Sequence, residues 1–309
     1  MPPERLLIWL KPQYLGDAVM AAPLLDATAS DRPLVLAGPA VQQVLSHHRD
    51  AVEFTDAGRL RGLEVLRQGL HLRRQRFGRV LLVNRSFRSA LATRIAGIPI
   101  RVGHATEGRD LLLSHRVPYP ADRYEAECYL DLWRALGHEA PEARPALELT
   151  PEERLRGQEL AGGATVGIQP GARYAEKQYP LAKLAAVVQA LVDDSQRIAL
   201  LGGPDEVEAS RQFQKMLDVP VVDLVGRCSI RETMASLATL RLMLGSDTGV
   251  MHLAVGVGCA TVTIFGPNPA AKWGHPFAPH RVFEAPKGDP ARLPESAVLE
   301  GARSLLSRF

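Results

Sequence analysis

Cysteine is scarce in this chain of 309 residues. The three cysteines lie far apart, at Cys128, Cys228 and Cys259, and show no C-x-x-C spacing. This usage argues against a disulfide framework and a zinc cluster, and it indicates a reducing compartment. Long apolar runs are also missing, since no stretch approaches the ~18 residues of a membrane-spanning helix. The start of the chain lacks the length and the cleavage site of a signal peptide, so we expect a cytoplasmic protein.

Neither sign of charge is in large excess, because 37 lysines and arginines face 34 aspartates and glutamates and the formal net charge is +3. This balance is too mild to predict a nucleic-acid partner. The distribution is less even, with seven arginines and one acid, Glu64, between Arg59 and Arg79. Such a run is usually a solvated helix face. The alternative is a basic surface that meets an anionic membrane or a phosphorylated acceptor.

Familiar cofactor and metal motifs are absent as well. No G-x-G-x-x-G follows a strand pattern and no G-x-x-x-x-G-K-[ST] occurs, which argues against nicotinamide or flavin dehydrogenases and P-loop enzymes. There is also no D-x-D pair, the spacing with which metal-dependent sugar transferases hold a divalent ion against the pyrophosphate. If this chain handles a nucleotide sugar, protein groups must neutralise the leaving diphosphate. We therefore expect no metal and no cofactor.

The sequence does contain a regular alternation of short apolar runs and helical patterns. The runs are rich in Val, Ile and Leu and are not strictly alternating, as expected for strands buried on both faces of a parallel sheet. Strand and helix in alternation predict α/β layers. The candidate strands are residues 6–10, 34–37, 80–83, 165–169, 198–201, 221–223, 241–244 and 261–265. The candidate helices are residues 18–29, 86–96, 125–136, 181–192, 205–216 and 229–238.

A stretch rich in Pro and Glu, residues 137–146, separates two halves of the chain. Each half opens with a strand, a glycine-containing loop and a helix. We therefore predict an α/β protein of two Rossmann-like domains that face each other across a cleft, residues 1–145 and residues 146–309. The final segment, residues 294–309, has helical spacing. A helix here could cross back to the first domain.

A polar turn between two candidate strands is the most informative local feature. Asp247, Thr248 and Gly249 follow a buried run and open a short helix that also carries His252. Free backbone N–H groups and the positive end of the helix dipole make such a turn an anion site. Ligands also bind at the carboxyl ends of the strands in open parallel sheets. The alternative is that Asp247 caps the helix and His252 packs in the core. The residues alone leave both interpretations open.

The polar turn, together with Phe265-Gly266-Pro267, resembles the D-S/T-G-x-x-H turn and F-G-P of the ADP-heptose:lipopolysaccharide heptosyltransferase family. Other stretches resemble the same family in the same order. Residues 15–24 are similar to its first loop and helix, and residues 167–180 to its second phosphate loop. Three stretches are most similar to the second heptosyltransferase: residues 85–90, 96–104 and 109–115.

The inverting transfer that this family carries out needs a base on the acceptor hydroxyl and positive charge at the leaving diphosphate. Asp17, on a loop after the first candidate strand, is a candidate base, and an ordinary helix N-cap is the alternative. Lys177, in a loop with Gly and Pro before a helix, is the candidate cation, and a solvated lysine is the alternative. Glu206 or Glu208 could hold the ribose hydroxyls of the donor.

The resemblance implies a GT-B architecture and an inverting, metal-independent transfer of heptose from ADP-heptose to a sugar of the lipopolysaccharide inner core. The first domain would bind a phosphorylated glycolipid acceptor and the second an ADP-sugar, and the protein would contact the inner face of an anionic membrane. The candidate site residues are Asp17 as general base, Lys177 at the diphosphate, Gly171, Glu206, Asp247, Thr248, Gly249 and His252 for the donor, and Arg85 and Arg88 for the acceptor.

The chain departs from the family pattern at residues 173–176, at Cys259 and at Ala121-Asp122-Arg123-Tyr124, where a histidine is missing. Two other functions remain open on the same frame. One is a nucleotide-sugar epimerase or hydrolase, which would need the diphosphate loop and no acceptor site. The other is a non-catalytic nucleotide-sugar binding protein. The presence of both Asp17 and Lys177 argues against the second of these.

Overall fold

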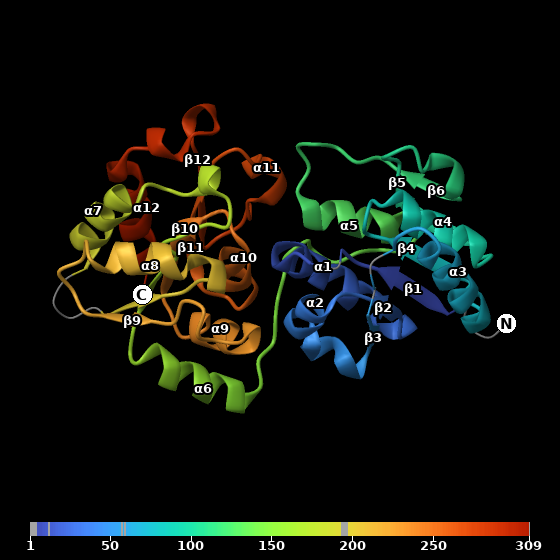
Figure 1. Ribbon diagram of the computed structural model, residues 1–309, viewed down its shortest axis with the longest axis horizontal. Helices are drawn as coiled ribbons and strands as arrows, with labels where there is room; N and C mark the ends of the chain where they lie inside the picture. The colour runs from blue at the N-terminus through green and yellow to red at the C-terminus, as the bar shows by residue number, and fades with distance from the viewer. Residues whose placement is uncertain (1–4, 12, 57, 59, 193–196, 309) are drawn as a thin grey trace. The chain divides into compact units, whose positions relative to one another are not determined.

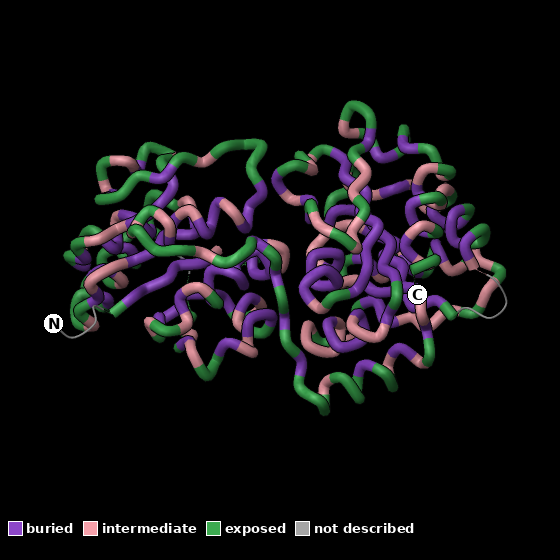
Figure 2. Tube along the Cα trace, turned by 180° about the vertical axis from the view of Figure 1, so that it is seen from behind, coloured by how far each residue is buried: buried purple, intermediate pink, exposed green. Residues whose placement is uncertain are grey.

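The computed structural model describes the chain except for residues 1–4, 12, 57, 59, 193–196 and 309. It divides into two compact units, Met1–Pro145 and Ala146–Phe309. Each unit is built around one parallel sheet (Figure 1). In Figure 2 the strands at the centre of each unit are almost entirely buried, while the helices alternate between buried and exposed residues. This is the pattern of sheets covered by helices on both faces.

The sheet of the first unit has the order β3-β2-β1-β4-β5-β6, and all of its strands pair in parallel. Chain order reverses between β1 and β4, which is the arrangement of a doubly wound Rossmann sheet. The central strand β1 reads Leu-Leu-Ile-Trp and is buried throughout. The strands are β1 (Leu6–Trp9), β2 (Leu34–Leu36), β3 (Glu53–Thr55), β4 (Arg79–Leu82), β5 (Ile100–His104) and β6 (His115–Val117).

Five α-helices lie in the described part of the first unit, where α1 lies against α5 and α3 lies against α4 (Figure 1). Helices α3 and α4 pack closely at Gly69 of α3. A Cβ added there would lie 2.7 Å from the Ile95 side chain of α4. The helices are α1 (Leu15–Thr28), α2 (Pro39–Val44), α3 (Glu64–Gln75), α4 (Phe87–Ile95) and α5 (Glu125–Arg134). Three short 3₁₀ turns complete the unit: η1 (Ala29–Asp31), η2 (Ser46–Asp50) and η3 (Asp110–Leu112).

The second unit repeats the plan with the order β12-β11-β10-β7-β8-β9, again in parallel throughout. Its strands are β7 (Val166–Ile168), β8 (Ile198–Leu200), β9 (Val221–Asp223), β10 (Leu242–Ser246), β11 (Ala260–Phe265) and β12 (His280–Glu284). Its helices are α6 (Pro151–Ala161), α7 (Leu181–Leu191), α8 (Val207–Gln214), α9 (Ile230–Leu237), α10 (Gly249–Gly256), α11 (Ala270–Trp273) and α12 (Glu295–Leu306). The 3₁₀ turns are η4 (Ala175–Lys177), η5 (Pro204–Glu206), η6 (Pro286–Gly288) and η7 (Pro290–Arg292).

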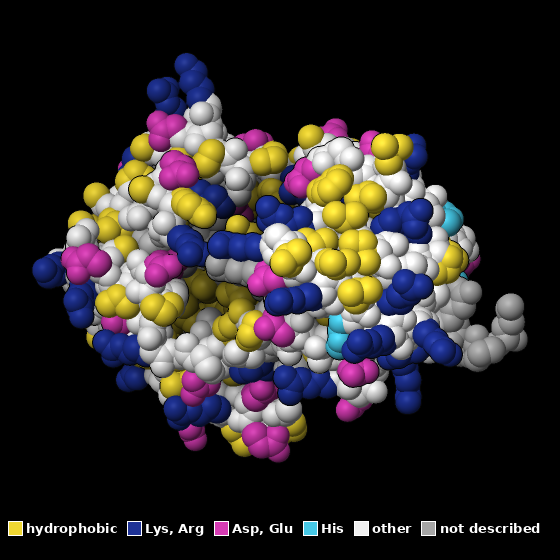
Figure 3. Space-filling view, turned by 45° about the vertical axis from the view of Figure 1, so that its right-hand side comes forward, with side chains coloured by type: hydrophobic (Ala, Val, Ile, Leu, Met, Phe, Trp, Pro, Cys, Tyr) yellow, Lys and Arg dark blue, Asp and Glu magenta, His cyan; other side chains and the backbone are white. Residues whose placement is uncertain are grey.

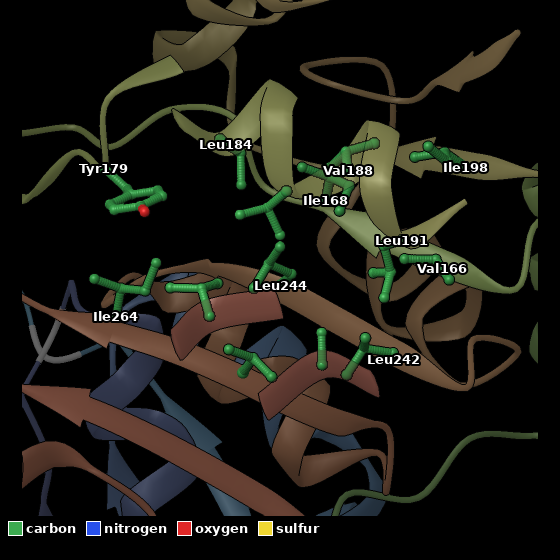
Figure 4. Close-up of a cluster of buried hydrophobic side chains, with 14 of the residues drawn as sticks. Val166, Ile168, Tyr179, Leu184, Val188, Leu191, Ile198, Leu242, Leu244 and Ile264 are labelled. Carbon is green, nitrogen blue, oxygen red and sulfur yellow. The ribbon is translucent and has the colours of Figure 1, made fainter. Parts of the chain in front are cut away.

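The core of the second unit lies between its central strands and the helices α7 and α12. Figure 4 shows Leu184 and Val188 of α7 above Leu244 and Ile264 of the sheet. The final helix belongs to this core, since three of its apolar residues are buried there: Val298, Ala302 and Leu305. The final helix is therefore part of the second unit. Its apolar face is already covered by α7, β10 and β11.

Eight of the twelve strands among the described residues coincide with sequence predictions. The four that were not predicted are β3, β5, β6 and β12. Three of these, β3, β6 and β12, lie at sheet edges, and polar residues occupy many of their positions. An edge strand needs less apolar sequence because one side of its backbone faces no further strand. Continuous hydrophobicity is consequently a poor signal for it.

Candidate active site

Asp17 lies inside the first turn of α1 and does not cap it, because the helix begins at Leu15 and its N-cap residue is Tyr14. The N-cap interpretation of Asp17 is therefore wrong. Its carboxylate is buried, and Oδ1 accepts hydrogen bonds from Lys11 Nζ at 2.5 Å and from Tyr129 Oη at 2.6 Å. Within the described part of the chain no donor reaches the other oxygen, Oδ2. One oxygen is thus held in place and the other is available to a ligand.

A second carboxylate, that of Glu125, lies behind this contact. Glu125 is the first residue of α5 and is fully buried. Its Oε1 lies 3.4 Å from Lys11 Nζ, and its Oε2 accepts a hydrogen bond from Tyr119 Oη at 2.7 Å. Burial, followed by the charges of Asp17 and Glu125, raises the pKa of Tyr129 well above its usual value. The Tyr129 hydroxyl therefore stays protonated and can only donate to the carboxylates.

Sequence reasoning missed Lys11, Glu125 and Tyr129. Lys11 comes two residues after the first strand. Glu125 and Tyr129 are four residues apart, so they share one face of a helix. These spacings indicate a shared site around Asp17 only when it is known that α5 packs on α1. Nothing in the local sequence indicates that pairing, which joins residues more than a hundred positions apart.

A pocket of about 380 Å³ opens in the same unit beside the carboxyl ends of β1 and β4. Chain order reverses between these strands, and doubly wound sheets bind ligands at such a point. Trp9, Asn84 and Ser86 line the pocket, and two arginines, Arg61 and Arg88, add positive charge to it. The pocket therefore suits a polar ligand that carries negative charge.

The two arginines predicted for the acceptor occupy different places. Arg88 is exposed and lines the pocket, where its Nη1 donates to the carbonyl of Leu60 at 3.3 Å. Arg85 is half-buried, and its guanidinium lies over the Tyr119 ring, 4.5 Å from the ring centroid. Arg85 thus contacts the network around Glu125 and does not line the pocket.

The arginines between Arg59 and Arg79 also lie in different places. Arg59 lies outside the described residues, and Arg61 lines the pocket. Arg79 belongs to β4, where its Nη2 lies 2.6 Å from the Asp31 carboxylate. Three others are exposed on α3: Arg67, Arg73 and Arg74. Together with Arg76, the exposed C-cap residue of α3, they form a basic helix surface.

In the second unit, Asp247 follows β10 and is buried. Its Oδ2 accepts hydrogen bonds from Lys177 Nζ at 2.9 Å and from Asn268 Nδ2 at 2.7 Å, and its Oδ1 lies 3.4 Å from His252 Nε2. Burial alone would raise the pKa of Asp247. The hydrogen bonds and charges of His252 and Lys177 outweigh burial and hold this pKa well below its usual value of 3.8. The carboxylate is therefore ionised at any physiological pH.

His252 joins this cluster to a second histidine, because its Nδ1 lies 2.9 Å from His275 Nε2. Burial, followed by the charge of His252, lowers the pKa of His275 well below its usual value. His275 is therefore neutral, and it holds the ring of His252 in the orientation that faces Asp247. Sequence reasoning placed His252 in the turn but missed His275 and Asn268. Asn268 follows the F-G-P stretch immediately, and this position was the available signal.

The helix behind this cluster, α10, begins at Gly249 with Thr248 as its N-cap residue, and no side chain caps it. The interpretation of Asp247 as the cap is therefore wrong. Thr248 Oγ1 is buried and has no hydrogen-bond partner among the described residues. A buried hydroxyl without a partner is costly, and here it stands at the positive end of a helix. Both features favour an anionic ligand beside Thr248.

Gly171 and Glu206 contact each other in the same unit. A Cβ on Gly171 would lie 3.0 Å from Glu206 Cβ, so a larger residue here would press against the Glu206 side chain. Glu206 is buried, its Oε1 accepts a hydrogen bond from Gln169 Nε2 at 2.9 Å, and burial raises its pKa. Its Oε2 has no hydrogen-bond partner in the described residues. Glu208, the other candidate for the ribose, is exposed on α8.

Two observations concern metals and membranes. The described residues contain no group of three His, Cys, Asp or Glu side chains placed to hold a metal ion. Across those residues, each helix is too short or too polar to span a bilayer. Within the described residues, no disulfide bond joins the three cysteines.

Comparison with known proteins bears on both the fold and the activity. Lipopolysaccharide heptosyltransferase 2 of Escherichia coli K12 is 24% identical over 298 residues, which cover 85% of this chain and 83% of that protein. A family 9 glycosyl transferase from Veillonella parvula superposes with a TM-score of 0.85 at 17% identity, covering 99% of this chain and 98% of that one. The ADP-heptose heptosyltransferase II of E. coli superposes with a TM-score of 0.81 at 21% identity, covering 98% and 99%.

Two doubly wound sheets with these neighbours define the GT-B class of glycosyltransferases. The sequence profile of glycosyltransferase family 9 (heptosyltransferase) matches residues 65–284, and the chain belongs to that family. The predicted family and fold class are confirmed, and the protein is an enzyme that transfers a sugar. The idea of a non-catalytic binding protein is therefore set aside.

Proposed function

We propose that this glycosyltransferase transfers heptose from ADP-heptose, with inversion and without a metal ion, to a sugar of the lipopolysaccharide inner core. The observation that carries the donor half is the buried cluster of Lys177, Asp247 and Asn268 beside the N-terminus of α10. The E. coli relatives are named for ADP-heptose and lipopolysaccharide, which supports the same donor and acceptor.

The leaving diphosphate needs positive charge, and two groups of the second unit can supply it. Lys177 carries an ammonium, and the first N–H groups of α10, beginning at Gly249, carry the positive end of the helix dipole. Thr248 offers a hydroxyl donor at the same helix end. Glu206 Oε2 could accept a ribose hydroxyl, which would satisfy an oxygen that otherwise has no partner among the described residues. Residues 146–309 are therefore proposed as the nucleotide-sugar domain.

Residues 1–145 are proposed as the acceptor domain. The pocket beside β1 and β4 has two arginines, Arg61 and Arg88, that can pair with phosphate groups on a glycolipid. Asp17 is proposed as the general base, since its Oδ2 can take the proton of an acceptor hydroxyl while Oδ1 stays on Lys11 and Tyr129. Arg85 would act on the acceptor side through Tyr119.

We further propose that the enzyme works in the cytoplasm at the inner face of the membrane and that α3 contacts anionic lipid. Three leucines of α3 are exposed, Leu63 at its N-cap by 72% and Leu66 and Leu70 by 46% each. Their spacing of three and four residues places them in one stripe. Arg67 and Arg74 lie on the same exposed side.

An apolar stripe beside arginines is typical of a helix that lies in a membrane interface. Apolar and basic side chains also lie next to each other on the face that Figure 3 displays.

The decisive experiment is a panel of nucleotide sugars scored by nucleotide release, with and without a truncated core glycolipid. We expect release from ADP-heptose that depends on the acceptor and persists in excess chelator. Release without any acceptor would instead indicate a hydrolase or an epimerase on the same frame. Release that requires added magnesium would overturn metal independence.

A further inference from the structure

Two buried carboxylates share one ammonium group in the first unit. The Asp17 and Glu125 side chains are 10% and 0% exposed, and both lie within 3.4 Å of Lys11 Nζ. Lys11 is itself only 14% exposed in its side chain. The three groups together carry one net negative charge when all are ionised, and this charge is held away from water.

A buried net charge is costly, and the cost falls when the cluster takes up a proton. Lys11 works against that uptake at Asp17, because a nearby cation favours the ionised carboxylate. Glu125 works in favour of it, because a nearby anion disfavours a second negative charge. Once Asp17 is protonated, Lys11 and Glu125 remain as a neutral ion pair. The proton thus converts a charged cluster into a neutral one.

We propose that Glu125 is a positioning residue that keeps Asp17 basic enough to accept the acceptor proton, by offsetting the charge of Lys11. This inference rests on the proposed role of Asp17 as general base. The acceptor hydroxyl oxygen forms its bond to the anomeric carbon, and the bond from that carbon to the diphosphate oxygen breaks. The electron pair of the broken bond leaves with ADP, and the acceptor proton passes to Asp17 Oδ2. Lys11 and Glu125 keep their charges throughout.

The surroundings of Asp17 contain few other groups that titrate. Burial, followed by the hydrogen bond and charge of Glu125, raises the pKa of Tyr119, which stays a neutral donor like Tyr129. In the described residues, other ionisable groups on α1 and on the elements packed against it have their own partners: Asp26 with His48, Asp31 with Arg79, and Glu127 and Asp131 with Arg123 and Arg134. The guanidinium of Arg85 lies over the Tyr119 ring, and the Cys128 thiol of α5 donates to the carbonyl of Arg123.

The test compares the pH dependence of kcat/KM for Glu125→Gln and Lys11→Met, using ADP-heptose and a truncated core glycolipid. Glu125→Gln keeps the shape of the side chain and removes its charge. For this variant we expect the acidic limb of the pH profile of kcat/KM to move down by about one pH unit. We also expect kcat at pH 7.5 to fall about tenfold. Lys11→Met should move the acid limb up by about one unit. The double variant should lie between the two single variants.

A merely structural role for Glu125 would not move the two limbs in opposite directions. Glu127→Gln is the matched control, because Glu127 is on the same helix and pairs with Arg134 at 2.6 Å, away from Asp17. It should leave the pH profile unchanged. Unmoved limbs in both single variants, or limbs that move the same way, would overturn the inference. If Lys11→Met does not fold, Lys11→Gln takes its place.

A measurement without substrate separates this inference from the proposed function. The ¹³Cγ resonance of Asp17, assigned by its loss in Asp17→Asn, reports protonation directly. Its titration should shift down in Glu125→Gln and up in Lys11→Met. Opposite shifts would support the inference even if the natural acceptor were a different sugar. Identical titrations in the wild type and both variants would overturn it, whatever the outcome of the activity panel.

Discussion

At the scale of single residues, Asp17 carries the sharpest expectation. General base catalysis contributes ~10²–10⁴-fold, so Asp17→Asn should lower kcat by that order in steady-state assays of ADP release. The helix should survive, because Tyr14 and not Asp17 is the N-cap residue of α1. Asp26→Asn, on the exposed side of the same helix, is the matched control and should keep its activity. Normal kcat in a folded Asp17→Asn protein would show that the base lies elsewhere.

Asp247 makes a prediction about stability and pH. Its pKa is lowered in the folded protein, mainly by His252 and Lys177 acting against burial. Its contribution is therefore fully present above the unfolded pKa of ~3.9 and is lost as pH falls below that value. At pH 5.5, Asp247→Asn should lower the free energy of unfolding by about 1–3 kcal/mol. In urea titrations the difference from wild type should shrink between pH 4.5 and pH 3.

The control for this prediction is Asp289→Asn, since Asp289 is half-exposed and its carboxylate contacts Arg292 and the Ala291 amide, and asparagine can keep the amide contact. Its effect should be small at every pH. A deficit in Asp247→Asn that stayed constant down to pH 3 would mean that the carboxylate's charge contributes nothing to folding.

Residues that touch across the fold were harder to predict than residues that follow one another. The turn at Asp247 was identified because its polar residues are consecutive and open a helix. Asn268 and His275, which complete that cluster, come from other segments, and only the position of Asn268 directly after the F-G-P stretch offered a signal. Glu125 is the clearest example, because its partner Lys11 comes from a distant part of the chain and reaches it only where α5 packs on α1.

At the scale of helices and strands, α3 tests the membrane proposal. Replacing Leu63, Leu66 and Leu70 together by serine removes the exposed apolar stripe and leaves the buried side of the helix, at Val65 and Leu72, intact. We expect binding to vesicles with 30% anionic phospholipid to fall about tenfold or more in sedimentation assays, because each leucine contributes up to ~1.5–3 kcal/mol when fully buried. Binding of ADP should not change.

Charge reversal in the same helix should act differently. Arg67, Arg73 and Arg74 changed to glutamate should abolish the preference for anionic vesicles, weaken the salt dependence of binding and raise the KM for the acceptor. Leu155→Ser on α6, another exposed leucine at 62%, is the control for both sets. Unchanged vesicle binding and unchanged acceptor kinetics in both sets would make α3 an ordinary solvated helix. A loss of dimers in place of lipid binding would identify the stripe as a contact between two copies.

Strands whose two faces are both buried could largely be predicted from the sequence. Strands such as β1 and β10 are continuous apolar runs because both faces of each sheet are covered. Edge strands such as β3 and β12 were not predicted, because exposed polar residues interrupt their apolar sequence. The start of α1 was placed three residues late, since Leu15-Gly16-Asp17 resembles a loop and becomes helical only in its packed context.

At the scale of the whole molecule, the two units should respond separately to nucleotide. ADP in excess chelator should protect backbone amides of the second unit from hydrogen exchange, above all in residues 170–180 and 247–252. At a hundredfold excess over Kd, the stabilisation is ~2.7 kcal/mol, which slows exchange through unfolding of that unit about 100-fold. Amides of the first unit should exchange as before.

Two outcomes of that experiment would contradict the assignment. Protection that appears only after magnesium is added would show that a metal, and not Lys177 with the helix end, neutralises the diphosphate. Protection confined to residues 1–145 would reverse the proposed division of donor and acceptor between the domains. AMP provides the control, because it lacks the second phosphate that Lys177 is proposed to bind.

The ion pair between Lys177 and Asp247 has a further consequence for turnover. Under the proposed role of Lys177, an incoming diphosphate would compete with the Asp247 carboxylate for the same ammonium, which is 2.9 Å from Asp247 Oδ2. After the sugar had left, this carboxylate would be placed to pair with the lysine again as the nucleotide dissociates. The ion pair would then shorten the residence of the spent nucleotide, at the cost of tighter binding.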